Sequence, residues 1–256
     1  MKNDNLKGDG KNILGDETME IVGRYKGESA REYALRILRS NIISMKLKPG
    51  SVVSENEIAL NMGLSRTPVR EALIELSKAQ IVEIYPQKGS VISLIDTELV
   101  EEARFLRLII EPEIVRLACN LATEKDIFDL KENVRLQEFY LEHPDPDRLL
   151  ELDDAFHKKL FTICKKERTY LMIKGFMIHY DRFRNLSLVT IKDLKIVSDH
   201  KAILEAIIEH DEEAAKASIC KHLNRFEIDM QMIRELYPEY FKKYEQAQPE
   251  IKEMVK

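Results

Sequence analysis

The chain has 256 residues, of which 44% are hydrophobic and 33% charged, with only 9 Gly and 8 Pro. This composition allows a sizeable packed core, excludes collagen-like, mucin-like and natively unfolded proteins, and at this length favours two domains. No apolar run approaches the ~18 residues of a membrane span, and the N-terminus has no apolar signal core, so we expect a cytoplasmic protein without membrane contact. Cys119, Cys164 and Cys220 are widely spaced, which favours buried free thiols over a disulfide framework.

The net charge of −5 is unevenly distributed along the chain. Residues 30–93 hold nine Lys or Arg and six Asp or Glu, whereas residues 94–256 hold 26 and 33. A basic segment is thus followed by an acidic one, which indicates two domains with different partners. The predicted organisation is a flexible N-terminal arm over 1–27, a DNA-binding domain over 28–93, a helical domain over 94–240 and a tail over 241–256.

The first expected elements are three helices and a hairpin. Apolar residues at helical spacing, a capping-box sequence from Ser54 to Glu57 and a Thr67–Pro68 start with Thr67 as N-cap predict the helices. Gly63 gives the backbone the freedom for a tight turn between the second and the third helix. Two β-branched runs around Pro86–Gly89 predict the hairpin. The expected bounds are 29–43, 55–62 and 67–79 for the helices and 81–85 and 90–93 for the strands.

The chain after Asp96 is helical in pattern throughout. The expected helices are 97–121, 125–142, 146–164, 168–187, 191–209 and 212–236. The predicted fold class is therefore mainly α: an N-terminal winged helix-turn-helix with a small β-hairpin, followed by an all-α bundle of six or seven helices.

In a winged helix-turn-helix the third helix enters the major groove of DNA. The start of this helix carries two guanidiniums and two hydroxyls at the positive end of the helix dipole, where phosphates are attracted and an arginine can pair with a guanine edge. The hairpin adds a cation and a glycine that permits close backbone approach. Winged helices also serve as protein-contact modules, and the spacing alone leaves that alternative open. The candidate DNA-binding residues are Ser65, Arg66, Thr67, Arg70, Lys88 and Gly89.

Residues 28–93 closely resemble the DNA-binding domain of the GntR family of bacterial transcription regulators. The resemblance rests on Leu47–Gly50, Ser54–Ala59 and the string Ser65-Arg66-Thr67-Pro68-Val69-Arg70-Glu71-Ala72-Leu73. It implies that Arg66, Thr67 and Arg70 contact DNA, that Ser65 holds a phosphate, and that Lys88 and Gly89 form the wing tip. Many members carry Arg at the position of Asn56, so a contact from the second helix is expected to differ here.

Two pairs of residues in the helical domain have the spacing of metal ligands. Asp153 and His157 are four residues apart, so both lie on one face of a helix. His200 and His222 lie almost equally far from a helix break near Asp211, so an antiparallel hairpin places them opposite one another. One carboxylate and three imidazoles suit a divalent transition metal. A histidine beside an apolar stripe is, however, more often a hydrogen-bonded core residue, and that alternative stays open.

Residues 94–240 resemble the ligand-binding domain of the FadR-type GntR subfamily, called the FCD domain. The resemblance implies that Asp153, His157, His200 and His222 bind a metal, zinc or nickel, which helps to hold a small carboxylate effector. It also makes Arg107 a candidate anchor for the effector carboxylate, although its spacing from Glu111 equally predicts a salt bridge. The segment Cys164–Arg168 departs from the family pattern and leaves the effector's identity open.

The sequence therefore predicts a homodimeric, DNA-binding transcription regulator, expected to be a repressor, whose binding to operator DNA is modulated by a small organic acid. A metal sensor, with the ion itself as the signal, is the first alternative. A metal-dependent hydrolase is the second, with Asp154 and Glu151 as possible bases, but it has no need of the Ser65–Arg70 string. No catalytic residue is assigned, and His179 is left without a role.

Overall fold

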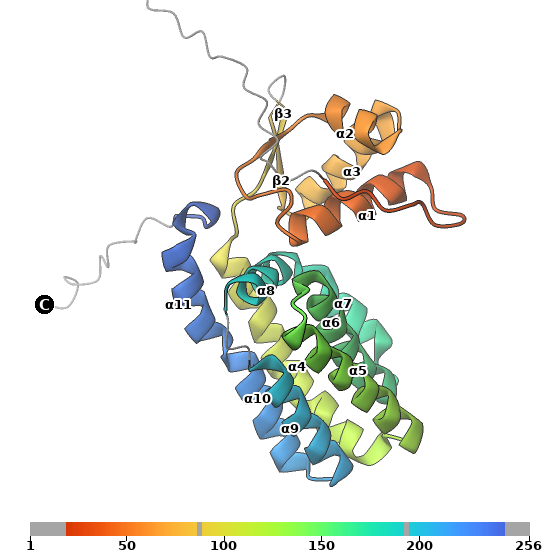
Figure 1. The fold of residues 1–256 in the computed structure, drawn as a ribbon, viewed down its shortest axis with the longest axis vertical. Coiled ribbons are helices and arrows are strands. Elements are labelled where there is room, and N and C mark those ends of the chain that lie inside the picture. The colour runs from red at the N-terminus through yellow and green to blue at the C-terminus, as the bar shows by residue number, and fades with distance from the viewer. Residues whose placement is uncertain (1–18, 86–88, 192–194, 244–256) are drawn as a thin grey trace, which may run out of the picture.

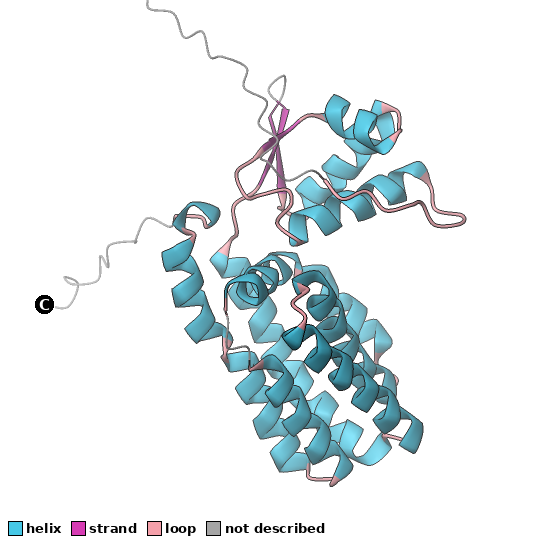
Figure 2. Cartoon of the chain, viewed as in Figure 1, coloured by secondary structure: helices cyan, strands magenta, loops and turns pink. Residues whose placement is uncertain are grey.

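The structure, a computed structural model, describes residues 19–85, 89–191 and 195–243. Figure 1 shows a small N-terminal domain seated on one end of a larger helical bundle, and in Figure 2 the strands lie only in the small domain. The elements of the small domain are α1 (Ala30–Ile43), β1 (Val52–Val53), α2 (Glu55–Met62), α3 (Arg66–Lys78), β2 (Val82–Tyr85) and β3 (Gly89–Ile92).

The expected hairpin is part of a three-stranded antiparallel sheet with the strand order β1-β3-β2. β1 is the strand that the sequence did not indicate, and it pairs Val52 with Val91 and Val53 with Ser90. A strand of two residues is too short to have a recognisable alternation of polar and apolar side chains. It comes just after Gly50, whose positive φ of 81° turns the chain back towards the sheet.

Helix α3, the predicted recognition helix that would enter the DNA groove, starts earlier than the sequence predicted. Ser65 is its N-cap and Arg66 its first residue, so the assignment of Thr67 as N-cap was wrong. Pro68 is the third helical residue rather than the first. Proline is tolerated there because the amides of the first turn have no acceptor within the helix.

The larger domain consists of helices, as expected, so the predicted fold class is confirmed. The bounds are α4 (Thr97–Leu121), α5 (Glu124–Glu142), α6 (Pro146–Ile163), α7 (Glu167–Phe176), α8 (Ile178–Thr190), α9 (Ile196–Ile208), α10 (Glu212–Asn224) and α11 (Phe226–Leu236). The sequence treated α7 with α8, and α10 with α11, as single helices. At Met177 and Arg225 the backbone stays close to helical φ and ψ, and no proline or capping side chain marks either break. Gly175, in the last turn of α7, is a weak signal for the first of them.

Each domain has its own hydrophobic core, and helix α8 joins the two. Its first residue, Ile178, is buried in the core of the small domain together with residues of α1 and α3. Phe183, less than two turns further on, is buried in the core of the helical domain. Helix α8 accordingly lies at the end of the bundle that faces the small domain (Figure 1). Among the described residues, no helix is long and apolar enough to cross a membrane.

Candidate metal centre and nucleic-acid interface

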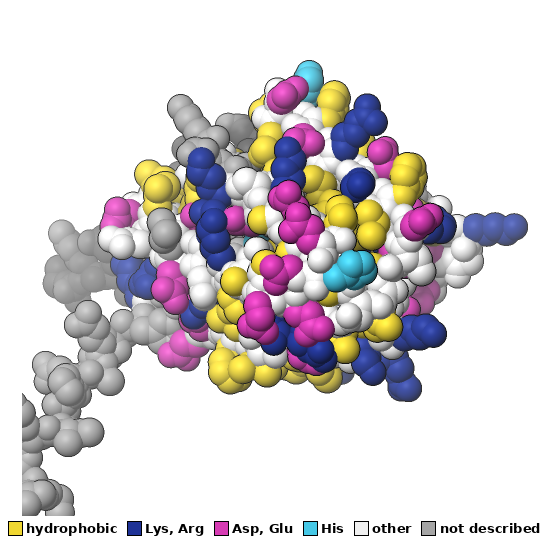
Figure 3. All heavy atoms as spheres, turned by 90° about the horizontal axis from the view of Figure 1, so that it is seen from below, with side chains coloured by type: hydrophobic (Ala, Val, Ile, Leu, Met, Phe, Trp, Pro, Cys, Tyr) yellow, Lys and Arg dark blue, Asp and Glu magenta, His cyan; other side chains and the backbone are white. Residues whose placement is uncertain are grey.

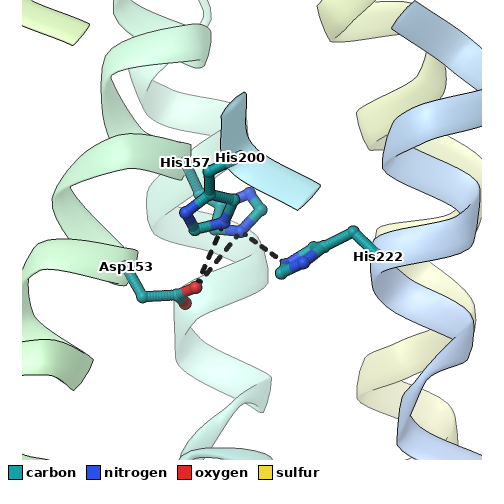
Figure 4. A group of neighbouring side chains, drawn as sticks. All are labelled: Asp153, His157, His200 and His222. Carbon is teal, nitrogen blue, oxygen red and sulfur yellow. Dashed lines mark hydrogen bonds and ion pairs between the residues drawn. The ribbon is translucent and has the colours of Figure 1, made fainter. Parts of the chain in front are cut away.

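Four side chains from three helices converge inside the helical domain. Asp153 and His157 project from the same face of α6, His200 comes from α9, and His222 comes from α10 (Figure 4). Each offers one ligand atom, and these atoms all lie within 4.8 Å of one another. The structure therefore brings together the four residues that the sequence singled out, from positions up to 69 residues apart.

The spacing of the ligand atoms fits a single cation. Nε2 of His157 lies 3.2 Å from Nε2 of His222, and Nε2 of His200 lies 3.3 Å from Oδ1 of Asp153. Ligands about 2.1 Å from a tetrahedral ion are about 3.4 Å apart. Asp153 Oδ1 and His200 Nε2 are buried and have no hydrogen-bond partner in the described part of the chain. Buried polar atoms without a partner are costly, and a cation would satisfy both of these.

The three imidazoles are held in the form that binds metal. Burial lowers the pKa of His157, His200 and His222, so all three are neutral at physiological pH. Nδ1 of His157 lies 2.8 Å from Oε2 of Glu111, which leaves Nε2 of that ring directed to the cluster. Carboxylates in this position orient a ligating histidine and raise its basicity. The cluster could hold a metal ion, and its chemistry of one carboxylate and three imidazoles suits a divalent transition metal.

Arg107 forms the salt bridge with Glu111 that its spacing allowed. Nε of Arg107 donates to Oε1 of Glu111 at 2.5 Å, and both side chains are almost fully buried. Burial alone would raise the pKa of Glu111, but the charge of Arg107 holds it well below its usual value. Glu111 in turn contacts His157, so Arg107 is linked to the cluster through one carboxylate.

A cavity of about 330 Å³ opens beside the cluster. Asp153 and His222 belong both to the cluster and to the cavity wall, and Arg107 also reaches the wall. Most of the other lining residues are apolar or aromatic, and the remaining cations are on α8, just before α9 and at the break before α11. These further lining residues include Tyr180, Phe183, Arg184, Leu188, Ile191, Lys195, Ile196, Arg225, Phe226 and Met232.

Arg184 is a residue of the cavity that the sequence analysis missed. Its guanidinium pairs with Asp153, and it also donates to Asp154 and Asp181 at 2.8 Å each. A signal was present in the sequence, because Arg184 lies on the side of the helix that carries Tyr180 and Phe183 and interrupts their apolar pattern. A cation on the buried face of an amphipathic helix indicates either an ion pair or a ligand.

The candidate DNA-binding residues lie on the outer side of α3 and at the start of β3. Ser65, Arg66, Thr67 and Arg70 are all exposed, while the opposite face of α3 packs into the core through residues such as Val69 and Leu73. Nε of Arg66 donates to Glu55 of α2 at 2.6 Å. Arg66, Arg70 and Gly89 line one groove between α3 and the sheet. Lys88 lies outside the described residues.

Gly89, which the resemblance places at the wing tip, also has a backbone conformation that favours glycine. Its φ of +103° falls in the region that residues with a side chain rarely adopt, so the backbone at the start of β3 requires glycine there.

The far end of the helical bundle presents a different surface from the groove. Lys and Arg are interspersed there with Asp and Glu in Figure 3, so on that face the acidic excess does not form one patch.

His179, which the sequence left without a role, connects the two domains. Its Nδ1 accepts from the backbone amide of Asp96 at 3.2 Å, and its Nε2 lies 3.3 Å from the backbone oxygen of Gln80, just beyond α3. Three residues on, Arg182 donates to the backbone oxygen of Ser93 at 2.7 Å. Helix α8 therefore contacts the end of the recognition helix and the connection between the domains.

A winged helix-turn-helix joined to a second, helical domain defines a class: DNA-binding regulators with a separate helical domain. Comparison with known proteins makes the assignment specific. Residues 31–92 match the family described as "Bacterial regulatory proteins, gntR family", and residues 102–225 match the "FCD domain". The chain belongs to the GntR family of transcription regulators and carries an FCD domain.

The relatives are regulators rather than enzymes. The chain is 30% identical over 207 residues, 80% of this chain and 91% of the relative, to the HTH-type transcriptional repressor RspR of Escherichia coli. It is 24% identical over 180 residues, 68% of this chain and 74% of the relative, to the gluconate operon transcriptional repressor of Bacillus subtilis. Among solved structures, E. coli McbR/YncC superposes with a TM-score of 0.69 at 18% identity, over 82% of this chain and 99% of that one.

Proposed function

We propose that this regulator is a repressor whose affinity for operator DNA is controlled by a small carboxylate bound at the metal in the helical domain. The observation that carries the proposal is the shared wall: Asp153 and His222 face both the ligand cluster and the cavity. A divalent ion on one carboxylate and three neutral imidazoles keeps a net positive charge. An anion entering the cavity would therefore be attracted to the ion.

The cavity lining supports a particular kind of acid. Arg184 and Arg107 stand at the cluster end, where a carboxylate would be paired, and Leu188, Ile191 and Met232 offer apolar surface elsewhere in the wall. A small cavity with a few polar groups and mainly apolar walls suits a ligand with one charged end. We therefore propose a short monocarboxylic acid with an apolar chain or ring as the effector.

Helix α8 offers a physical route from the effector to DNA. Tyr180, Phe183 and Arg184 line the cavity, while Ile178 and His179 on the same helix contact the DNA-binding domain. An effector that binds one position of α8 better than another would shift the population of DNA-binding arrangements. Two curated relatives are named as repressors, which supports release from DNA as the direction of the response.

We also propose a homodimer, because one recognition helix reads only a half-site and two-fold symmetry lets two helices read a palindrome. Phe105 and Ile109 on α4 are 61% and 63% exposed and lie one turn apart on the same face, which supports burial against a second copy. Sedimentation of the protein with and without a Phe105→Glu substitution tests this assignment. A monomeric wild-type protein would contradict it.

The central experiment combines ligand screening with DNA binding. Metal-loaded protein is screened by thermal shift against short fatty acids, aromatic acids, sugar acids and dicarboxylates, because a ligand of the native state raises the melting temperature. Binders are then tested for loss of affinity to operator DNA selected from a random-sequence pool. A loss of affinity on adding acid, absent in His222→Ala, supports the proposal. If metal alone changes the affinity and no acid does, the ion itself is the signal.

A further inference from the structure

A chain of side-chain hydrogen bonds reaches the metal cluster from α5, a helix that provides none of the four candidate ligands. Asn133 and Gln137 lie one turn apart on α5, between α6 and α9. Nδ2 of Asn133 donates to the backbone oxygen of Leu152 at 3.0 Å, next to Asp153. Nε2 of Gln137 donates to Oδ1 of Asn133 at 2.6 Å. Oε1 of Gln137 then lies 2.8 Å from Nδ1 of His200.

The direction of every bond in this chain is fixed at the Leu152 end. A backbone carbonyl can only accept, so Asn133 must present its NH₂ group to it and its oxygen to Gln137. Gln137 must then turn its NH₂ group to Asn133 and its oxygen to His200. That oxygen can be satisfied only by a hydrogen on Nδ1 of the histidine. A neutral imidazole with its hydrogen on Nδ1 carries a lone pair on Nε2.

Burial keeps the chain from reversing. The side chain of Gln137 is fully buried and His200 is equally inaccessible, so water cannot exchange with either group and turn the amide around. The Nε2 atom of His200 faces Oδ1 of Asp153 at 3.3 Å and has no other partner among the described residues. Two acceptors that face each other without a hydrogen between them repel, and a cation placed between them removes the repulsion.

We propose that Asn133 and Gln137 are positioning residues for the metal: they hold His200 in the tautomer whose Nε2 lone pair points into the cluster before any ion arrives. The inference rests on the proposed metal site and extends it to a helix without ligands. It also explains a polar residue at Gln137, which occupies a core-facing position in the apolar stripe of Leu130 and Val134. Substitution of a residue that hydrogen-bonds a metal ligand typically weakens metal affinity by about 10- to 100-fold.

The test has two readouts, one of which needs no metal. In metal-free protein labelled with ¹⁵N-histidine, long-range ¹H–¹⁵N correlation gives the tautomer of each ring, and His200→Asn identifies the signals of His200. We expect hydrogen on Nδ1 in the wild type and in Gln137→Glu, which keeps an acceptor, and a change of tautomer population in Gln137→Met, which has none. Hydrogen on Nε2 of His200 in the wild type would overturn the inference, whatever the protein's affinity for metal.

The second readout is zinc affinity, measured by competition with a chromogenic chelator. Gln137→Met should bind zinc about 10- to 100-fold more weakly than the wild type. Val134→Ala is the matched control, because it removes a buried side chain from the same helix face without touching the hydrogen-bond chain. It should keep wild-type affinity. Equal affinity in Gln137→Met and the wild type, or equal losses in Gln137→Met and Val134→Ala, would overturn the positioning role. Absence of zinc binding in the wild type would instead refute the metal site, and the tautomer would then show only whether Asn133 and Gln137 orient the ring of His200.

Discussion

Nε2 of His157 lies 3.2 Å from Nε2 of His222, and burial keeps both rings neutral. Oε2 of Glu111 lies 2.8 Å from Nδ1 of His157, which favours a hydrogen on that nitrogen and leaves the Nε2 lone pair directed at His222. Nitrogens arranged in this way attract a cation.

Removing metal should destabilise the protein. A ligand present at 100 times its dissociation constant stabilises the folded state by about 2.7 kcal/mol, so chelation should lower the melting temperature measurably. In His222→Ala the chelator should have a smaller effect, and elemental analysis should find less metal. His143→Ala is the control, because His143 is exposed at the end of α5 and outside the cluster. Full metal occupancy in His222→Ala would contradict the four-ligand site.

Arg70→Ala should weaken operator binding by about 1–3 kcal/mol if its guanidinium pairs with a base. Its exposed position on α3, in the groove shared with the wing, is the structural reason. Fluorescence anisotropy with selected operator DNA at fixed salt measures the change. Arg135→Ala removes an equally exposed arginine from α5 and should leave affinity unchanged. Equal affinities for Arg70→Ala and the wild type would remove Arg70 from the interface.

Acid should destabilise the junction between the domains through His179. Burial lowers the pKa of His179 to about 4, from an ordinary value of 6.5. Between these two pKa values the unfolded chain binds a proton at His179 that the folded chain does not. The contribution of neutral His179 to the free energy of unfolding is therefore complete above pH 6.5 and decreases as the pH falls towards 4. Between pH 7.5 and pH 5 the loss is about 2 kcal/mol.

Urea unfolding of the wild type and His179→Gln at both pH values measures this contribution. Glutamine can still accept from Asp96 and donate to Gln80, but it does not titrate. The pH dependence of the variant should be weaker by about 2 kcal/mol over that range. Parallel pH profiles for the two proteins would show that His179 titrates normally in the folded state.

The buried pair of Arg107 and Glu111 should respond unequally to single and double substitution. Arg107→Ala leaves the carboxylate of Glu111 buried without its cation, which costs about 3–5 kcal/mol. Replacing the pair with Met and Leu removes both charges together, so the free energy of unfolding should return towards the wild-type value. Urea unfolding measures both variants. Losses that simply add in the double variant would show that the pair is not energetically coupled.

Periodicity and spacing made much of this molecule predictable. Asp153 and His157 had to share a face once α6 formed, and His200 and His222 had to meet once α9 and α10 formed a hairpin. The breaks at Met177 and Arg225 were missed because their backbone stays near helical geometry. The break at Met177 nevertheless matters, because it allows α8 to turn away from α7 towards the DNA-binding domain.

Residues whose role depends on a partner from another helix were harder to find. Arg184 and Gln137 each stand out as polar residues on a buried helix face, but the sequence does not indicate what they meet there. Their partners lie 31 and 63 residues away and become neighbours only through tertiary packing. Such residues can be flagged from the sequence as unusual, and their function can be assigned only in the folded chain.

The burial of Ile178 has a practical consequence for dissecting this regulator. A fragment that ends at Ser93 would contain every residue of the winged helix and still lack one side chain of its core. An unfilled space of this size costs several kcal/mol in a small domain, about 2–5 kcal/mol for the loss of an isoleucine side chain. The isolated DNA-binding domain should therefore have low stability. An exchange of DNA-binding domains between relatives would have to include the start of α8.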